Sequence, residues 1–81
     1  MSVRPPFAEV AAREARAAID GTWSERGILE VLVAALRDHP APGPARDAAL
    51  AFEANVRVSP ILAGHALAEF VEDGLPGGAR A

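Results

Sequence analysis

His65, Glu69 and Asp73 come closest to a chemical site in residue type and spacing, because they are four residues apart. On a helix they would form one stripe carrying an imidazole and two carboxylates. A metal usually needs three or four protein ligands, and the only other histidine, His39, stands at an expected helix end, where attraction to the helix dipole explains it. We therefore interpret the stripe as solvated and expect no metal site and no cofactor.

Nucleophilic catalysis has few candidate residues, since the chain has no Cys, Lys or Tyr. Ser24 lies in the expected capping segment Thr22 to Glu25, and Ser59 precedes an expected helix, so both hydroxyls already have capping roles. The Gly77-Gly78 pair has no strand before it and no helix after it, so it does not form a phosphate-binding loop. We expect no catalytic residues and no enzymatic activity.

The charged residues argue against nucleic acid as a partner. Eight arginines face 11 acidic residues, which gives a net charge of −3, and the segment with His65 and Glu69 has no base-reading cation. The absence of Lys and Gln beside abundant Ala, Gly, Pro and Arg is typical of a GC-rich bacterial genome.

Size and composition predict one small domain. The chain has 81 residues, and Ala supplies 19 of its apolar residues, so the larger side chains form a thin core. The longest apolar run, Val31 to Leu36, is far shorter than the roughly 20 residues that span a bilayer. No signal-like region opens the sequence. We expect a cytoplasmic protein without membrane association.

Gly and Pro divide the chain into four segments of helical length and no strand. The prediction is an all-α fold, a compact four-helix bundle with short loops and the second helix at its centre. A single domain is expected over 1–75 and a flexible Pro/Gly tail over 76–81. The expected helices are 5–20, 22–39, 44–58 and 60–73.

The second segment carries the strongest signals. Thr22 to Glu25 matches a capping box with Thr22 as the cap. Only one of the nine residues 28–36 is charged. This predicts a helix that is apolar on almost every side and is covered by other parts of the protein. Arg37 and His39 suit the negative end of its dipole, and Pro40 ends it.

The other segments offer core faces at three- and four-residue spacing. Gly21 is expected to end the first helix, and Gly74 with Leu75 to end the fourth in a Schellman motif. The expected inward residues are Phe7, Val10, Ala11, Ala15, Ala18, Ile19, Ala45, Ala48, Ala49, Phe52, Val56, Ala63, Leu67, Phe70, Val71 and Leu75.

The core has few large side chains, and the second helix is apolar on almost every side. Together these features predict an apolar surface that stays exposed on the folded chain and is covered by another chain. We expect an apolar strip from the first two helices, with the single Trp either covering their corner or serving as an exposed anchor. The predicted partner-binding residues are Phe7, Val10, Trp23, Ile28, Leu29 and Val33.

Residues 29–71 resemble bacterial effector-associated, death-like adaptor domains. The matching features are the run Leu32 to Leu36, His39-Pro40, Phe52-Glu53, and a Ser-led helix that ends Leu67 to Val71. The loop Pro40 to Pro44 departs from the shorter Pro-Gly-Gly turn of that family. The resemblance implies a non-enzymatic bundle that recruits a partner in a bacterial defence or signalling assembly.

The sequence therefore favours a small helical protein–protein interaction module, an adaptor or small subunit that docks on an identical or larger chain. A homo-oligomer and a hetero-complex are both open. One alternative is a DNA-binding regulator or antitoxin-like protein, disfavoured by charge. Another is an accessory subunit of a larger enzyme, which needs the same kind of docking face.

Overall fold

Four α-helices and no strand make up residues 4–73, the part of the chain that the computed structural model describes. This confirms the predicted all-α four-helix fold. The expected tail over 76–81 and the expected helix ending at Gly74 and Leu75 lie outside the described residues. The helices are α1 (Phe7–Asp20), α2 (Glu25–Asp38), α3 (Pro44–Asn55) and α4 (Pro60–Asp73).

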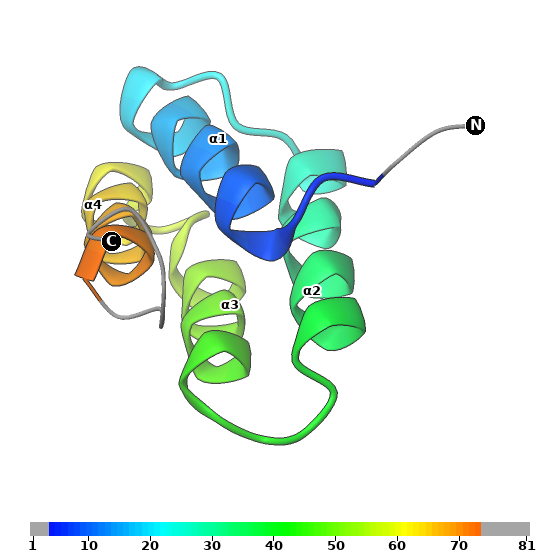
Figure 1. Ribbon diagram of the computed structural model, residues 1–81. Helices are drawn as coiled ribbons and strands as arrows, with labels where there is room; N and C mark the ends of the chain where they lie inside the picture. Colours follow the sequence, from blue (N-terminus) through cyan, green and yellow to red (C-terminus); the bar gives the residue numbers. More distant parts are fainter. Residues whose placement is uncertain (1–3, 74–81) are drawn as a thin grey trace.

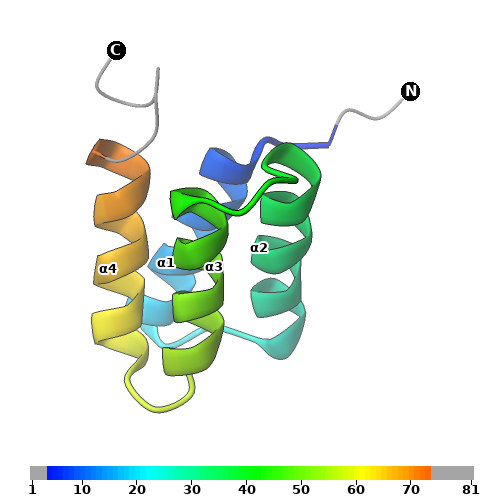
Figure 2. The ribbon, with the colours of Figure 1, turned by 90° about the horizontal axis from the view of Figure 1, so that it is seen from below.

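The helices form a ring in which successive helices run in opposite directions (Figures 1 and 2). α1 packs against α2 and α4, and α3 packs against the same two helices. The expectation of a central second helix is wrong, because α2 has two main neighbours like every other helix. The most extensive contact joins α1 to α4.

Small residues allow α1 and α4 to approach closely. Ala11, Ala15 and Ala18 are buried on α1, and Gly64 is buried on α4. A β-carbon at Gly64 would lie 2.7 Å from the Ala15 carbonyl oxygen, which is well inside an ordinary contact distance. The glycine therefore sets the spacing of these two helices.

The core lies inside the ring and follows most of the predicted inward positions. Ile19, Ala48 and Phe70 are only half-buried at its margin. No buried polar or charged residue is found within the described residues. The buried apolar residues are Phe7, Val10, Ala11, Ala15, Ala18, Ile28, Val31, Ala34, Ala35, Ala45, Ala49, Phe52, Val56, Ala63, Leu67 and Val71.

The connection from α1 to α2 begins at Gly21, which has φ of 83° and so needs the left-handed region that glycine favours. The Thr22 N–H donates to the Ala17 carbonyl at 2.8 Å, and the Gly21 N–H donates to the Ala18 carbonyl at 3.3 Å. These bonds form a Schellman motif, which confirms that Gly21 ends the helix.

The start of α2 differs from the prediction. Ser24 is the N-cap, and its hydroxyl accepts from the Gly27 N–H at 3.0 Å. Thr22 cannot fill this role because its backbone belongs to the ending of α1, and its hydroxyl donates to the Ala17 carbonyl at 3.4 Å. α2 therefore begins at Glu25 rather than at residue 22.

The end of α2 holds the start of α1. Pro6 offers no side-chain cap there, and instead the Asp38 carboxylate accepts from the Phe7 N–H at 2.7 Å. Arg37 pairs with Asp38 at 2.7 Å and donates to the Pro5 carbonyl at 2.6 Å. Hydrogen bonds from Arg37 and from the Phe7 N–H lower the pKa of Asp38 to about 2. The His39 ring completes this clamp by meeting Phe7 edge-on, with 5.6 Å between the ring centroids.

A second tie joins the opposite end of α2 to α3. The Arg57 guanidinium donates to both carboxylate oxygens of Glu25, at 2.6 and 2.8 Å, and to the Glu53 carbonyl at 2.8 Å. The hydrogen bond from Arg57 lowers the pKa of Glu25, and the same bond raises the pKa of Arg57. α2 is thus anchored at both ends, which leaves its outward side clear.

Candidate functional site

The structure divides the predicted partner-binding residues into two groups. Phe7, Val10 and Ile28 are buried in the core, so their predicted place on an exposed strip is wrong. Alanines dominate the inner helix faces and let the ring close around these larger side chains. Of the six residues, only Leu29 and Val33 are exposed.

Trp23 lies in the connection between α1 and α2, where it is half-buried and packs against the core. This position agrees with the interpretation that its ring covers the corner between the first two helices. It does not agree with an exposed anchor. A partner that approaches α2 would therefore meet the side chains of the helix itself.

Leu29, Val33 and Leu36 form an exposed apolar stripe on α2, here called the α2 outer face. Their exposed fractions are 58%, 45% and 52%. They follow one another at four- and three-residue spacing, which places them on one side of a helix. The opposite side of α2 is fully occupied by the core, so this helix presents one apolar side inward and a second one outward.

A groove runs along each flank of the α2 outer face. The α1–α2 groove has a volume of about 480 Å³. The α2–α3 groove has a volume of about 220 Å³ and is lined by Leu32, Ala35, Leu36, Arg46, Ala49 and Leu50. The larger groove is lined by Arg4, Pro5, Val10, Arg13, Arg26, Leu29, Glu30, Val33, Ala34 and Arg37.

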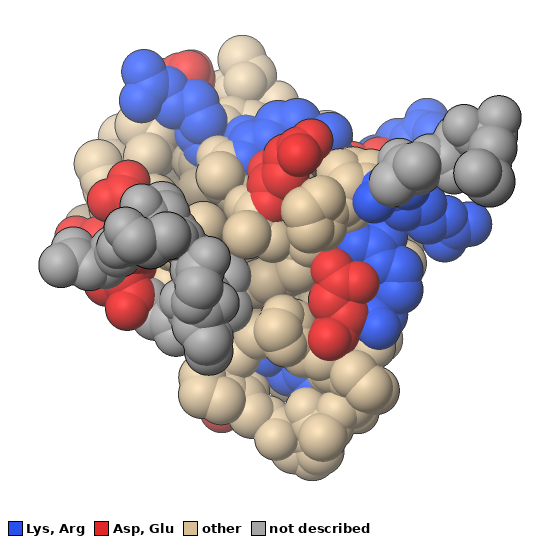
Figure 3. All heavy atoms as spheres, viewed as in Figure 1, with Lys and Arg blue, Asp and Glu red and all other residues tan. Residues whose placement is uncertain are grey.

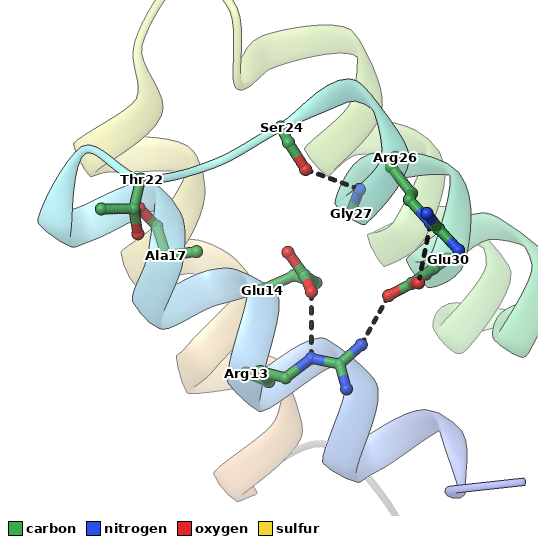
Figure 4. A network of polar contacts seen from close by, with 8 residues as sticks. All are labelled: Arg13, Glu14, Ala17, Thr22, Ser24, Arg26, Gly27 and Glu30. Carbon is green, nitrogen blue, oxygen red and sulfur yellow. Dashed lines mark hydrogen bonds and ion pairs between the residues drawn. The ribbon is translucent and has the colours of Figure 1, made fainter.

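Ion pairs cross the wall of the α1–α2 groove (Figure 4). Arg13 on α1 donates to Glu30 on α2 at 2.6 Å and to its neighbour Glu14 at 3.0 Å. Arg26 reaches Glu30 at 3.8 Å, and its side chain is 88% exposed. The Glu30 carboxylate is therefore shared by two arginines, and Arg26 is held by this one long pair.

Charge is unevenly distributed over the surface. Arginine atoms lie on the side of α2 and over α1, with acidic atoms beside them, whereas acidic atoms without arginine appear over α4 (Figure 3). Residues 60–73 contain Glu69, Glu72 and Asp73 and no Arg. The neighbourhood of the α1–α2 groove is thus more positive than the acidic chain as a whole.

A second group of exposed apolar residues lies where α3 meets α4, here called the α3–α4 corner. It consists of Val58, Ile61 and Leu62, of which Val58 is 84% exposed. None of the three lines the α1–α2 groove or the α2–α3 groove. The corner is an exposed apolar surface separate from these two grooves.

His65, Glu69 and Asp73, which share a four-residue spacing, lie on α4. His65 and Glu69 are exposed, and neither takes part in the ties that hold the helices together. Within residues 4–73 no three His, Asp or Glu side chains form a group that could hold a metal ion. The arrangement offers exposed carboxylates and an imidazole that line neither the α1–α2 groove nor the α2–α3 groove.

Sequence reasoning missed Leu36 and Leu50 as exposed residues. The signal for Leu36 was present, since it lies seven residues after Leu29 and three after Val33. The segment was interpreted as covered on every side, although four short helices in a ring cover only the inner side of each. Leu50 had no such signal, because its exposure depends on how α3 is rotated against α2.

Comparison with protein-family models, with curated proteins and with solved structures found no match for this chain. None of the helices in residues 4–73 has the length and apolar character needed to cross a membrane. The surface geometry of the four helices is therefore the basis for a functional proposal.

Proposed function

We propose that this chain is a small, non-enzymatic protein–protein interaction module that binds a protein partner through the α2 outer face. One observation carries the proposal: Leu29, Val33 and Leu36 are about half exposed on a helix whose other side is already buried. Contiguous exposed apolar residues mark interaction sites on soluble proteins.

The outer face contributes little to folding, which makes a role in binding the better explanation. The core already fills the ring from all four helices, and both ends of α2 are fixed by the Arg37–Asp38 clamp and the Arg57–Glu25 pair. Two flanking grooves give a partner side chain a place to insert. The resemblance of residues 29–71 to death-like adaptor domains points in the same direction.

An adaptor, a small subunit and an accessory subunit of an enzyme all need such a face, and they differ only in the partner. DNA binding receives less support. α4 has no Arg, and the α1–α2 groove has an apolar floor that would be exposed beside a phosphate backbone.

The test compares Val33→Asp with Val58→Asp. Both replace an exposed valine with the same charge, one on the α2 outer face and the other at the α3–α4 corner. We expect Val33→Asp to cost about 1 kcal/mol or less of stability, because a half-exposed side chain loses only part of its burial energy. Circular dichroism checks that both variants stay folded. Light scattering and mass spectrometry then measure what associates with each tagged chain in its own cell.

The expected result is a complex that forms with the unmodified chain and with Val58→Asp and is lost with Val33→Asp. If only Val58→Asp abolished the complex, the docking surface would be the α3–α4 corner and not the α2 outer face. Equal association of all three chains would contradict a role for the α2 outer face.

A further inference from the structure

We infer that the α1–α2 groove accepts an acidic amphipathic helix from a partner protein, with its apolar side on Leu29 and Val33 and its carboxylates on the surrounding arginines. This inference rests on the proposed function and names the chemistry of the partner. It is carried by the order of charged and apolar residues along the groove.

Positive charge dominates the groove lining, with four arginines against one carboxylate. That carboxylate, Glu30, is already engaged by Arg13 at 2.6 Å. Two more carboxylates lie nearby, Glu14 beside Arg13 and Asp38 beside Arg37, and the balance remains positive when both are counted. A local excess of arginine on a chain with net charge −3 favours an acidic partner.

Three of the four arginines stand at the ends of the apolar floor. Arg26 lies in the first turn of α2 and Arg37 in the last, with Leu29 and Val33 between them. Arg4 belongs to the Arg37 end, because Arg37 donates to the Pro5 carbonyl next to it. Arg37 follows Arg26 by eleven positions along the helix, a rise of about 16 Å.

This order specifies the partner segment. Two apolar side chains one turn apart would cover Leu29 and Val33, which are themselves one turn apart. Carboxylates one turn beyond each end would reach Arg26 on one side and Arg4 and Arg37 on the other. Arginine binds carboxylates in a planar, two-point geometry, which suits this contact.

A second copy of the chain fits the groove less well. A symmetric pairing of two α2 outer faces would bring the arginines of one copy against those of the other. The α4 helix of a second copy has its exposed apolar residues, Ile61 and Leu62, near one end and Glu69 and Glu72 toward the other. It therefore does not place carboxylates on both sides of an apolar centre.

The experiment uses two stapled helical peptides of about 16 residues. The first has two central leucines one turn apart and two glutamates beyond each end, and the second has glutamine at every glutamate position. Fluorescence anisotropy measures the binding of both to the full chain, to Arg26→Glu and to Arg16→Glu. Arg16 is the matched control, because it also makes one ion pair within its helix, to Asp20 at 3.4 Å, and does not line the groove.

We expect the glutamate peptide to bind at least about tenfold more tightly than the glutamine peptide to the unmodified chain and to Arg16→Glu. Arg26→Glu should weaken glutamate-peptide binding about fivefold to tenfold and leave glutamine-peptide binding nearly unchanged. A peptide with lysine in place of glutamate should then bind Arg26→Glu more tightly than the unmodified chain.

Three outcomes would overturn the inference. The first is no binding of the glutamate peptide. The second is equal binding of both peptides that Val33→Asp abolishes, which would leave the α2 outer face as a docking surface without a preference for acid. The third is self-association of the unmodified chain that Arg26→Glu disrupts, which would make a second copy the occupant.

Discussion

Replacing Gly64 with alanine tests how closely α1 and α4 are packed. The new methyl group would lie 2.7 Å from the Ala15 carbonyl oxygen, 2.8 Å from Cγ1 of Ile19 and 3.2 Å from Cβ of Ala18. Ordinary contacts are about 3.3–3.6 Å to oxygen and about 3.5–4.0 Å between carbons. The first obstacle is backbone inside a helix, so α1 as a whole must move away from α4.

The magnitude follows from two opposing effects. Overfilling a packed core costs about 1–3 kcal/mol, and the upper end applies here because backbone cannot rotate away. Alanine has a higher helix propensity than glycine, which stabilises the folded state by about 1 kcal/mol at a position inside a helix. We therefore expect Gly64→Ala to lower the free energy of unfolding by about 2 kcal/mol and the Tm by about 8–16 °C.

Gly27→Ala is the matched control, since Gly27 is also buried within a helix. A β-carbon there would meet only the end of the flexible Glu14 side chain, which can turn aside. Urea unfolding followed by circular dichroism should place Gly27→Ala within about 0.5 kcal/mol of the unmodified chain or above it. A Gly64→Ala variant as stable as Gly27→Ala would refute the close approach of α1 and α4.

Two further predictions concern the ties at the ends of α2. Asp38→Ala should cost about 1–2 kcal/mol at about pH 6, because the Phe7 N–H and Arg37 lose a charged acceptor. The pKa of Asp38 is lowered to about 2, so its stabilisation is present above its unfolded pKa near 4 and is lost as the pH falls toward 2. Urea titrations should therefore show the difference between the two chains shrinking from about pH 6 to about pH 2, and a constant difference would contradict the clamp. Arg57→Gln should lower the free energy of unfolding in dilute buffer and lower it less in about 0.5 M NaCl, because the pair of Arg57 with Glu25 is exposed and screened. A cost that salt leaves unchanged would show that Arg57 acts through packing.

Local patterns were sufficient to predict the elements of the fold. Gly21 requires a left-handed turn, Pro44 and Pro60 start helices, and Phe52 and Leu67 lie at core spacing, so each signal depends on its immediate neighbours. The cap of α2 was assigned two residues too early, because Thr22 and Ser24 are both good caps. Thr22 takes part in the hydrogen bonds that end α1, so Ser24 is the residue that caps α2.

The candidate site was harder to predict because it depends on rotation about helix axes. Phe7 and Leu29 are both large apolar residues near other apolar residues, and nothing in the sequence states which faces inward. In the ring, each helix can bury only one side, and α2 buries the side of Ile28 and Val31. The Asp38 cap on α1 was equally hidden, since its two ends are 31 residues apart in the chain.

Position-specific cross-linking tests the role of the α2 outer face most directly. A benzoylphenylalanine placed at Leu36 in the cell would contact whatever covers this face, and the same probe at exposed Ala12 on α1 is the control. We expect a cross-link from Leu36 to one protein, its loss when Val33→Asp is added, and no such product from Ala12. Cross-linking that is absent at Leu36, or equal at the two positions, would contradict the α2 outer face as the docking surface.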